Sequence, residues 1–160
     1  MDGELTVREV EDGEREWLAD VLREAWGEVV VSRGRLIDAT VLPAVVCERG
    51  GRAVGVATYE PGETDCELVT IDAFRPNGGV GSALLAAVED AARACGCRRL
   101  WLITTNDNLD ALRFYQRRGM RIAAVHTGAI EVSRSLKPSI PVTGHFGIEI
   151  RDELELEKSL

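Results

Sequence analysis

The chain has 160 residues, of which 45% are apolar and 29% are charged, and its formal net charge is −8 at neutral pH. This composition is typical of a globular protein with a buried core. The acidity argues against nucleic-acid binding, which depends on clustered Lys and Arg. No apolar run approaches the roughly 18 residues of a membrane helix, and the acidic N-terminus lacks a signal-peptide core. We therefore expect a single domain over residues 1–160, in the cytoplasm, with no membrane partner.

Four cysteines are present: Cys47, Cys66, Cys95 and Cys97. A chain of this length can stabilise itself by burial and needs no disulfide framework, so we expect small, buried, reduced thiols. A structural zinc site would require a second cysteine pair at ligand spacing, in addition to Cys95 and Cys97, and the sequence has none. We therefore expect no metal.

In the first half of the chain, apolar residues alternate with polar ones where strands are expected and recur at i, i+3 and i+4 where a helix is expected. Gly50-Gly51 is typical of a hairpin turn. Ser32 to Arg35 is a basic stretch in an otherwise acidic chain. The predicted elements are a strand over 5–10, a helix over 14–27, an apolar run over 29–31, and strands over 44–48, 52–59 and 67–72.

In the second half, an apolar stripe predicts a helix that begins at Val80 and ends at Gly96. A buried strand over 99–104, a helix over 108–118, a strand over 121–125 and a last strand over 148–156 follow. The long segment between the last two strands contains prolines and glycines, and such a connection is usually functional or mobile. The Glu-Leu-Glu-Leu-Glu ending suits an edge strand that pairs across a homodimer, or one whose charges prevent pairing. The order of elements indicates a mixed α/β fold.

A glycine-rich turn, Gly78-Gly79-Val80-Gly81-Ser82, stands between a predicted strand and a predicted helix. The free N–H groups and the dipole of a helix start bind anions, and glycine lets a ligand approach the backbone. A nucleotide P-loop is excluded because no lysine follows the glycines. A dinucleotide fingerprint is excluded because Leu84 stands where a third glycine is required. The alternative is a tight turn without a ligand.

Two motifs resemble those of the GNAT superfamily of N-acetyltransferases. The segment from Ile71 to Leu85 resembles its acyl-CoA signature, and the pattern Asn108, Ala111, Phe114, Tyr115, Gly119-Met120 resembles its second helix motif. The resemblance covers about residues 5 to 125 and the last strand. One departure is Pro76, which stands where the family usually has Arg or Gln and has no N–H for a phosphate; Arg75 comes one residue early.

The resemblance implies a central mixed, splayed sheet of about seven strands with helices on both faces. Acetyl-CoA would lie where two neighbouring strands separate. The backbone of Val69, Thr70 and Ile71 would contact the pantetheine arm, and Asn108 would touch it as well. The pyrophosphate would be held by Asn77, Gly78, Gly79, Val80, Gly81 and Ser82.

The resemblance also implies roles in direct acetyl transfer to an amine. Tyr115 would be the general acid, because a phenol with a pKa near 10 suits a thiolate whose thiol has a pKa near 8.5. Glu67 would be the general base, with Asp72 and Glu60 as weaker candidates. The N–H of Ile71 would polarise the thioester carbonyl. The alternatives are a packed aromatic residue for Tyr115 and a solvated edge residue for Glu67.

The acceptor is less well defined by the sequence. Net acidity favours a cationic amine, and a small molecule is expected. Arginines at positions 75, 113, 117 and 118 are candidates for neutralising coenzyme A; the alternative for the last three is a solvated helix face. The segment from Thr127 to Gly147 is a candidate acceptor lid, and His126 and His145 are expected to be structural. Two alternatives stay open: a catalytically silent acyl-CoA-binding module, and an acetyltransferase that modifies protein lysines or N-termini.

Overall fold

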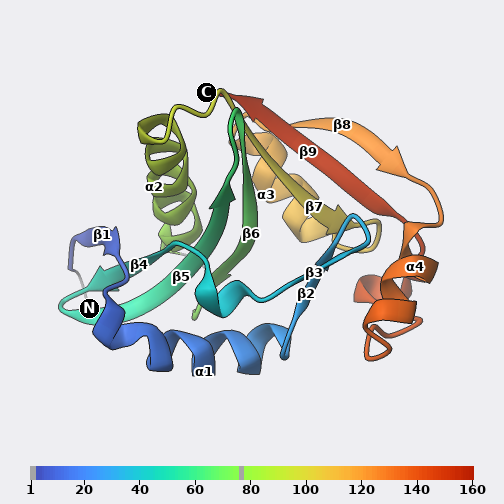
Figure 1. The fold of residues 1–160 in the computed structure, drawn as a ribbon, viewed down its shortest axis with the longest axis horizontal. Helices are drawn as coiled ribbons and strands as arrows, with labels where there is room; N and C mark the ends of the chain where they lie inside the picture. The colour runs from blue at the N-terminus through green and yellow to red at the C-terminus, as the bar shows by residue number, and fades with distance from the viewer. Residues whose placement is uncertain (1–2, 76–77) are drawn as a thin grey trace.

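A seven-stranded mixed sheet organises the chain, with strand order β1-β4-β5-β6-β7-β9-β8 (Figure 1). The computed structural model describes residues 3–75 and 78–160. The sheet strands are β1 (Leu5–Glu9), β4 (Ala44–Arg49), β5 (Arg52–Pro61), β6 (Asp65–Ala73), β7 (Arg99–Thr105), β8 (Arg121–His126) and β9 (Glu153–Ser159). Strands β6 and β7 pair in parallel, and the other neighbouring pairs are antiparallel.

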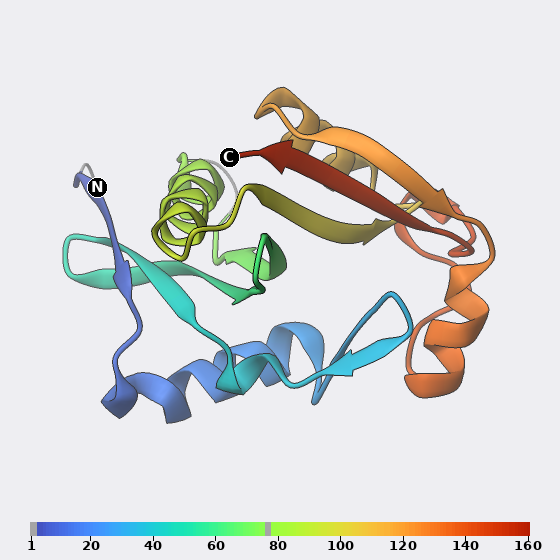
Figure 2. The ribbon, with the colours of Figure 1, turned by 45° about the horizontal axis from the view of Figure 1, so that its top comes forward.

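Helices cover both faces of the sheet, as Figure 2 shows. Buried side chains of α1 (Arg15–Trp26), such as Leu18 and Leu22, pack with Val46 and Val56 on one face. On the other face, α2 (Val80–Ala94) and α3 (Leu109–Arg117) form a second core cluster with β4 to β7 and β9. The mixed α/β class and the helices on both faces are therefore confirmed.

The sheet splits between β6 and β7. The two strands pair only from Asp65 with Arg99 to Glu67 with Trp101, although β6 continues to Ala73 and β7 to Thr105. Beyond that point β6 follows β5, whereas β7 follows β9. We call the point where the strands separate the fork. Parallel pairing is lost there, and backbone groups of β6 that would otherwise pair with β7 face the gap.

Between β8 and β9 the sequence prediction was incomplete. The segment contains an unpredicted helix, α4 (Ala129–Leu136), and the last strand is Glu153–Ser159 rather than 148–156. Residues 148–150 are extended but pair locally, since the N–H of Ile150 donates to the carbonyl of Val142 at 2.9 Å. Apolar alternation alone does not distinguish this local pairing from sheet pairing. Strand β9 also lies between β7 and β8, so the prediction that it forms an edge was wrong.

A short hairpin of β2 (Val30–Ser32) and β3 (Arg35–Ile37) projects beyond α1 and contacts α4. Its turn residues, Arg33 and Gly34, have φ angles of 50° and 73°. Two successive positive φ values are typical of a type I′ turn, which glycine adopts freely and arginine rarely adopts. The hairpin and α4 together lie on the open side of the fork (Figure 2).

Three of the cysteines are buried as expected, whereas Cys95 is exposed and the prediction of a buried thiol there was wrong. Within residues 3–75 and 78–160, no three His, Cys, Asp or Glu side chains are grouped as metal ligands. Among the same residues, no helix is both long enough and apolar enough to cross a membrane.

Candidate active site

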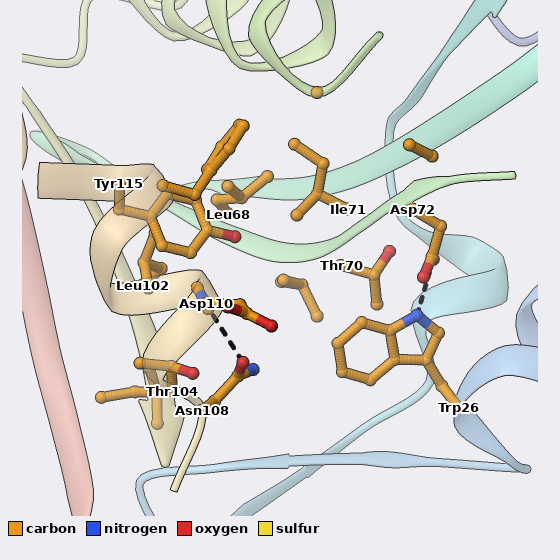
Figure 3. A pocket seen from close by; sticks show the side chains of 16 residues that line it. Trp26, Leu68, Thr70, Ile71, Asp72, Leu102, Thr104, Asn108, Asp110 and Tyr115 are labelled. Atoms are coloured by element: carbon orange, nitrogen blue, oxygen red, sulfur yellow. Dashed lines mark hydrogen bonds between the residues drawn. The ribbon is translucent and has the colours of Figure 1, made fainter. Parts of the chain in front are cut away.

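A cavity of about 460 Å³ occupies the fork on the side of α3 (Figure 3). We call it the fork cavity. It is lined by Leu68–Ala73 of β6, by Leu102–Thr104 of β7, by residues of α3, and by Asn108, Trp26 and Gly81. It lies where the divergence of β6 and β7 removes sheet pairing, so its presence follows from the fork itself.

Strand β6 carries a bulge in the wall of the fork cavity. Thr58 of β5 pairs with Thr70, and the next residue of β5, Tyr59, pairs with Leu68. Val69 therefore has no partner in β5, and a bulge of this kind re-aims the neighbouring groups of a strand. The three residues that were expected to contact pantetheine, Val69, Thr70 and Ile71, all line the cavity.

Tyr115 lies on α3, and its hydroxyl points into the fork cavity (Figure 3). The ring packs edge-on against Phe114, with centroids 5.2 Å apart. Burial, with a smaller contribution from the charge of Asp72, raises the pKa of the Tyr115 phenol well above its usual value of 10. The phenol is therefore protonated throughout the neutral range and can donate a proton or a hydrogen bond to a ligand.

Asp72 stands across the fork cavity from Tyr115 (Figure 3). Its carboxylate accepts a hydrogen bond of 2.7 Å from the indole N–H of Trp26, which fixes the end of α1 to the end of β6. Burial raises the pKa of Asp72, and the Trp26 bond opposes that change. Glu60, the other weaker base candidate, does not line the fork cavity. Its carboxylate pairs with Arg35 at 2.9 Å.

The glycine turn opens into a second hollow of about 270 Å³, which shares Ala73, Gly81 and Phe114 with the fork cavity. Gly78 and Gly79 have φ angles of 96° and 80°, a region that glycine tolerates without strain. The first helical bond of α2 runs from the N–H of Ala83 to the carbonyl of Gly79. The N–H groups before Ala83 therefore have no partner within the helix and are available to an anion.

Arg118 supplies a positive charge at this hollow. Its guanidinium donates to the hydroxyl of Ser82 at 2.7 Å and to the carbonyl of Phe114, and it stacks on the Phe114 ring at 3.8 Å. Of the four arginines considered from the sequence, Arg118 is the one that lines the hollow. Pro76 and Asn77 lie outside the described residues, so the predicted contact of Asn77 with the pyrophosphate lies there as well.

A cavity of about 210 Å³ lies on the other side of the fork, between the β2–β3 hairpin and α4. We call it the hairpin cavity. Glu67 lines it and is 3% exposed, so Glu67 is a buried residue in the third position of β6 rather than a solvated residue that opens the strand. Its carboxylate accepts a hydrogen bond of 2.7 Å from Ser32 and one of 3.3 Å from Arg35. Burial raises the pKa of Glu67, while the bonds from Ser32 and Arg35 moderate the increase.

The fork cavity and the hairpin cavity share one wall. The shared residues are Trp26, Val69, Ile103, Thr104 and Asn108. Asn108 caps α3, since its side-chain oxygen accepts a hydrogen bond of 3.3 Å from the N–H of Ala111. A thioester bound in the fork cavity and a nucleophile bound in the hairpin cavity would therefore meet at these shared residues. Tyr115 lines the fork cavity, and Glu67 lines the hairpin cavity.

Sequence reasoning missed the residues that complete the hairpin cavity, namely Ser133 of α4, Lys137 and Glu153 of β9. Glu153 and Glu155 alternate with apolar residues in the last strand, yet they are only 2% and 7% exposed. His126 bonds to Glu155 at 3.2 Å and lines neither cavity. The alternation of acidic and apolar residues gave no usable signal, because this pattern is typical of a strand with one solvated face.

A forked mixed sheet, with a glycine turn at a helix start and a cavity on each side of the fork, defines an acyltransferase that uses acetyl-CoA. The chain belongs to the acetyltransferase (GNAT) family, whose model matches residues 10–120. The family and the class of enzyme expected from the two sequence motifs are thereby confirmed.

Individual proteins are similar to this chain in sequence or in fold. YdhI of Bacillus subtilis (strain 168) is 40% identical over 143 residues, which span 88% of this chain and 89% of YdhI. A GNAT acetyltransferase from Elizabethkingia anophelis, solved with acetyl-CoA bound, superposes with a TM-score of 0.72 at 17% identity, covering 98% of each chain. An IAA acetyltransferase from Bacillus cereus ATCC 14579 gives a TM-score of 0.71 at 20% identity, covering 98% of this chain and 100% of that one. The two structures are similar in fold.

Proposed function

We propose that this chain, acting as a single cytoplasmic domain, transfers an acetyl group from acetyl-CoA to the amine of a small molecule by direct attack. The observation that carries the proposal is the shared wall at the fork, with Tyr115 on one side and Glu67 on the other. A hairpin cavity of about 210 Å³ is smaller than the roughly 300–1,000 Å³ of common ligand pockets, which favours a compact acceptor.

The fork cavity and the hollow at the glycine turn suit the two parts of acetyl-CoA. The hollow offers free N–H groups at the start of α2 and the guanidinium of Arg118, which fit a pyrophosphate. The fork cavity offers the unpaired edge of β6 at Val69 to Ile71, which fits the amides of pantetheine. The structure from Elizabethkingia anophelis, of the same fold, was solved with acetyl-CoA.

In the proposed reaction, Glu67 takes a proton from the acceptor ammonium, and the free amine forms a C–N bond with the thioester carbonyl carbon. The N–H of Ile71 stabilises the developing oxyanion. As the C–S bond breaks, Tyr115 donates its proton to the thiolate and recovers one from solvent. Burial raises the pKa of Tyr115, so the phenol keeps its proton until the thiolate leaves.

The first test of the proposal is a thermal-shift titration of the purified protein with acetyl-CoA, with ATP as the control ligand. A ligand present at about 100 times its Kd stabilises the folded state by about 2.7 kcal/mol. We expect a clear rise in Tm with acetyl-CoA and none with ATP. An unchanged Tm with saturating acetyl-CoA would contradict the proposal.

The second test separates an enzyme from a silent acyl-CoA-binding module. Tyr115→Phe should lower kcat about 100-fold, the lower end of the effect of losing a general acid, while the Kd for acetyl-CoA is retained. Tyr59→Phe is the matched control, because Tyr59 is the other tyrosine and lies buried in β5, outside both cavities. A chain that binds acetyl-CoA but releases no thiol with any amine would be a binding module.

A further inference from the structure

The hairpin cavity contains a buried carboxyl group that has no cationic partner among residues 3–75 and 78–160. Five acidic side chains are buried in the described part of the chain: Glu67, Glu89, Asp107, Glu153 and Glu155. Three of them pair with cations: Glu67 with Arg35, Glu89 with Lys158, and Glu155 with Arg99. Buried carboxylates are rarely left without such a partner, because removing a charge from water is costly.

Asp107 and Glu153 have only neutral hydrogen-bond donors among the described residues. Asp107 accepts from the hydroxyl of Thr105 and the N–H of His145, and it lines neither cavity. Glu153 accepts from the hydroxyl of Ser133 at 2.5 Å and from the N–H of Arg33 at 3.1 Å. Of these two carboxylates, Glu153 is the one that lines the cavity on the acceptor side.

The nearby cations do not neutralise Glu153. The guanidinium of Arg33 lies 3.7 Å from Glu155 and stacks over Trp101, so Arg33 offers Glu153 its backbone N–H rather than its charge. Lys137 also lines the cavity, but its ammonium donates to the carbonyl of Trp26 at 2.6 Å and thereby caps the end of α1. A cationic group of a ligand would supply the charge that the protein does not.

The two carboxylates of the hairpin cavity lie close enough to bind one small molecule. Ser32 donates to Glu67 at 2.7 Å, and the next residue, Arg33, donates to Glu153 at 3.1 Å. The donor atoms of two neighbouring residues are about 4 Å apart, so the bonded carboxylate oxygens lie within about 10 Å of each other. Arg33 holds this position at a φ of 50°, and strain in a side chain–bearing residue is often kept at a functional site.

We propose that the acceptor is a short diamine, whose reacting amine lies at Glu67 and whose second, protonated amine lies at Glu153. This inference rests on the proposed function and adds the class of its substrate. Glu67 removes a proton from one amine, whereas Glu153 holds the other through its carboxyl oxygens. Glu153 is then a specificity-determining residue that takes no part in the transfer itself.

The experiment compares three acceptors of similar length with saturating acetyl-CoA: 1,4-diaminobutane, n-butylamine and 4-aminobutanoate. The readout is thiol release, confirmed by the mass of the acetylated product. We expect kcat/KM for the diamine to exceed that for each of the other two by about 10-fold or more, the usual effect of one buried, charge-assisted hydrogen bond. The 4-aminobutanoate arm tests whether Lys137 binds a carboxylate instead.

The preference should depend on one side chain. In Glu153→Gln, the ratio of kcat/KM for the diamine to that for n-butylamine should fall about 10-fold or more, mainly through the KM of the diamine. Glu131→Gln is the matched control, because Glu131 is an exposed acidic residue on α4 and outside the cavity. Ser133→Ala, which removes one donor to Glu153, serves as a milder variant if Glu153→Gln loses its thermal shift with acetyl-CoA.

The outcomes separate this inference from the proposed function. Equal or better use of n-butylamine or 4-aminobutanoate would overturn the diamine assignment and leave the acetyltransferase standing. A preference that survives in both Glu153→Gln and Ser133→Ala would also overturn it. If none of the three compounds is acetylated although other primary amines are, the diamine class is wrong. If no amine at all is acetylated, the proposed function fails.

Discussion

The two cavities that meet at the fork are built in different ways. The fork cavity takes most of its wall from two short stretches, residues 68–73 and 102–115, and much of what it offers is backbone. The hairpin cavity takes residues from β2, β6, β7, α4 and β9, and the bond between Arg33 and Glu153 joins residues 120 positions apart. The side that fits the common acyl donor therefore depends on local backbone geometry. The side that fits the acceptor depends on side chains brought together by the tertiary fold.

The largest expected effect is confined to the hairpin cavity. Glu67→Gln should lower kcat by about 100-fold to 10,000-fold, because an amide cannot take the proton of the acceptor ammonium. The Kd for acetyl-CoA should stay the same, because Glu67 lines the hairpin cavity and not the fork cavity. Steady-state kinetics and an acetyl-CoA titration measure the two quantities. Glu60→Gln is the matched control, since Glu60 also pairs with Arg35 but lies outside both cavities.

The pH dependence sharpens this prediction. Burial raises the pKa of Glu67 above its ordinary value of 4.5, so the carboxylate gains a proton at a higher pH than a solvated one does. A protonated Glu67 cannot act as a base. The rate advantage of the wild type over Glu67→Gln should therefore shrink as the pH falls through that raised pKa. A ratio of rates that does not change between about pH 8 and about pH 4, below the ordinary value of 4.5, would contradict the role of Glu67.

A substitution under the glycine turn should disturb the fork side through the backbone. A Cβ at Gly55 of β5 would lie 2.6 Å from a methyl carbon of Val80 and 2.7 Å from the backbone oxygen of Asp72. Gly55→Ala therefore forces the start of α2 away from the sheet. It should lower the free energy of unfolding by about 1–3 kcal/mol, as overpacking does, and weaken acetyl-CoA binding. Denaturant unfolding measures the first effect, and Gly13→Ala, with no atom within 4 Å, is the control.

The smallest expected effect concerns Arg118, whose guanidinium lines the hollow at the glycine turn. Arg118→Gln should raise the Kd for acetyl-CoA about 10-fold, because a charge-assisted bond to a phosphate is lost. Arg117→Gln removes the same charge from an exposed neighbour that lines neither the fork cavity nor the hollow, so its Kd should change by less than about twofold. Equal losses in both variants would indicate a general effect of net charge instead.

The fork side was largely predictable because its residues follow one another in the sequence. Glycines at a helix start and the spacing from Asn108 to Tyr115 each depend on local geometry, and the structure places them at two adjoining cavities. Arg118 was one of four candidates, and its contact with Ser82 depends on how α3 packs beside α2. Sequence spacing carries no information on that packing.

The hairpin side was less predictable because its partners are distant in the sequence. Helix α4 falls in a segment rich in Pro and Gly, where apolar periodicity is short. The last strand begins five residues later than its alternation indicates, because residues 148–150 pair with the preceding segment instead of β7. Glu153 resembles a solvated residue until α4 and the β2–β3 hairpin cover it. Burial of a charged side chain by a separate element leaves no local pattern.

The position of Trp26 has a spectroscopic consequence. Its indole forms part of the wall common to both cavities and is bonded to Asp72 at 2.7 Å. Since tryptophan emission responds to polarity and to nearby charge, Trp26 is an intrinsic fluorophore for donor and acceptor occupancy alike. The other two tryptophans are Trp17 and Trp101, and neither lines a cavity at the fork. A chain with both replaced by phenylalanine would report the order in which the two substrates bind, without any added label.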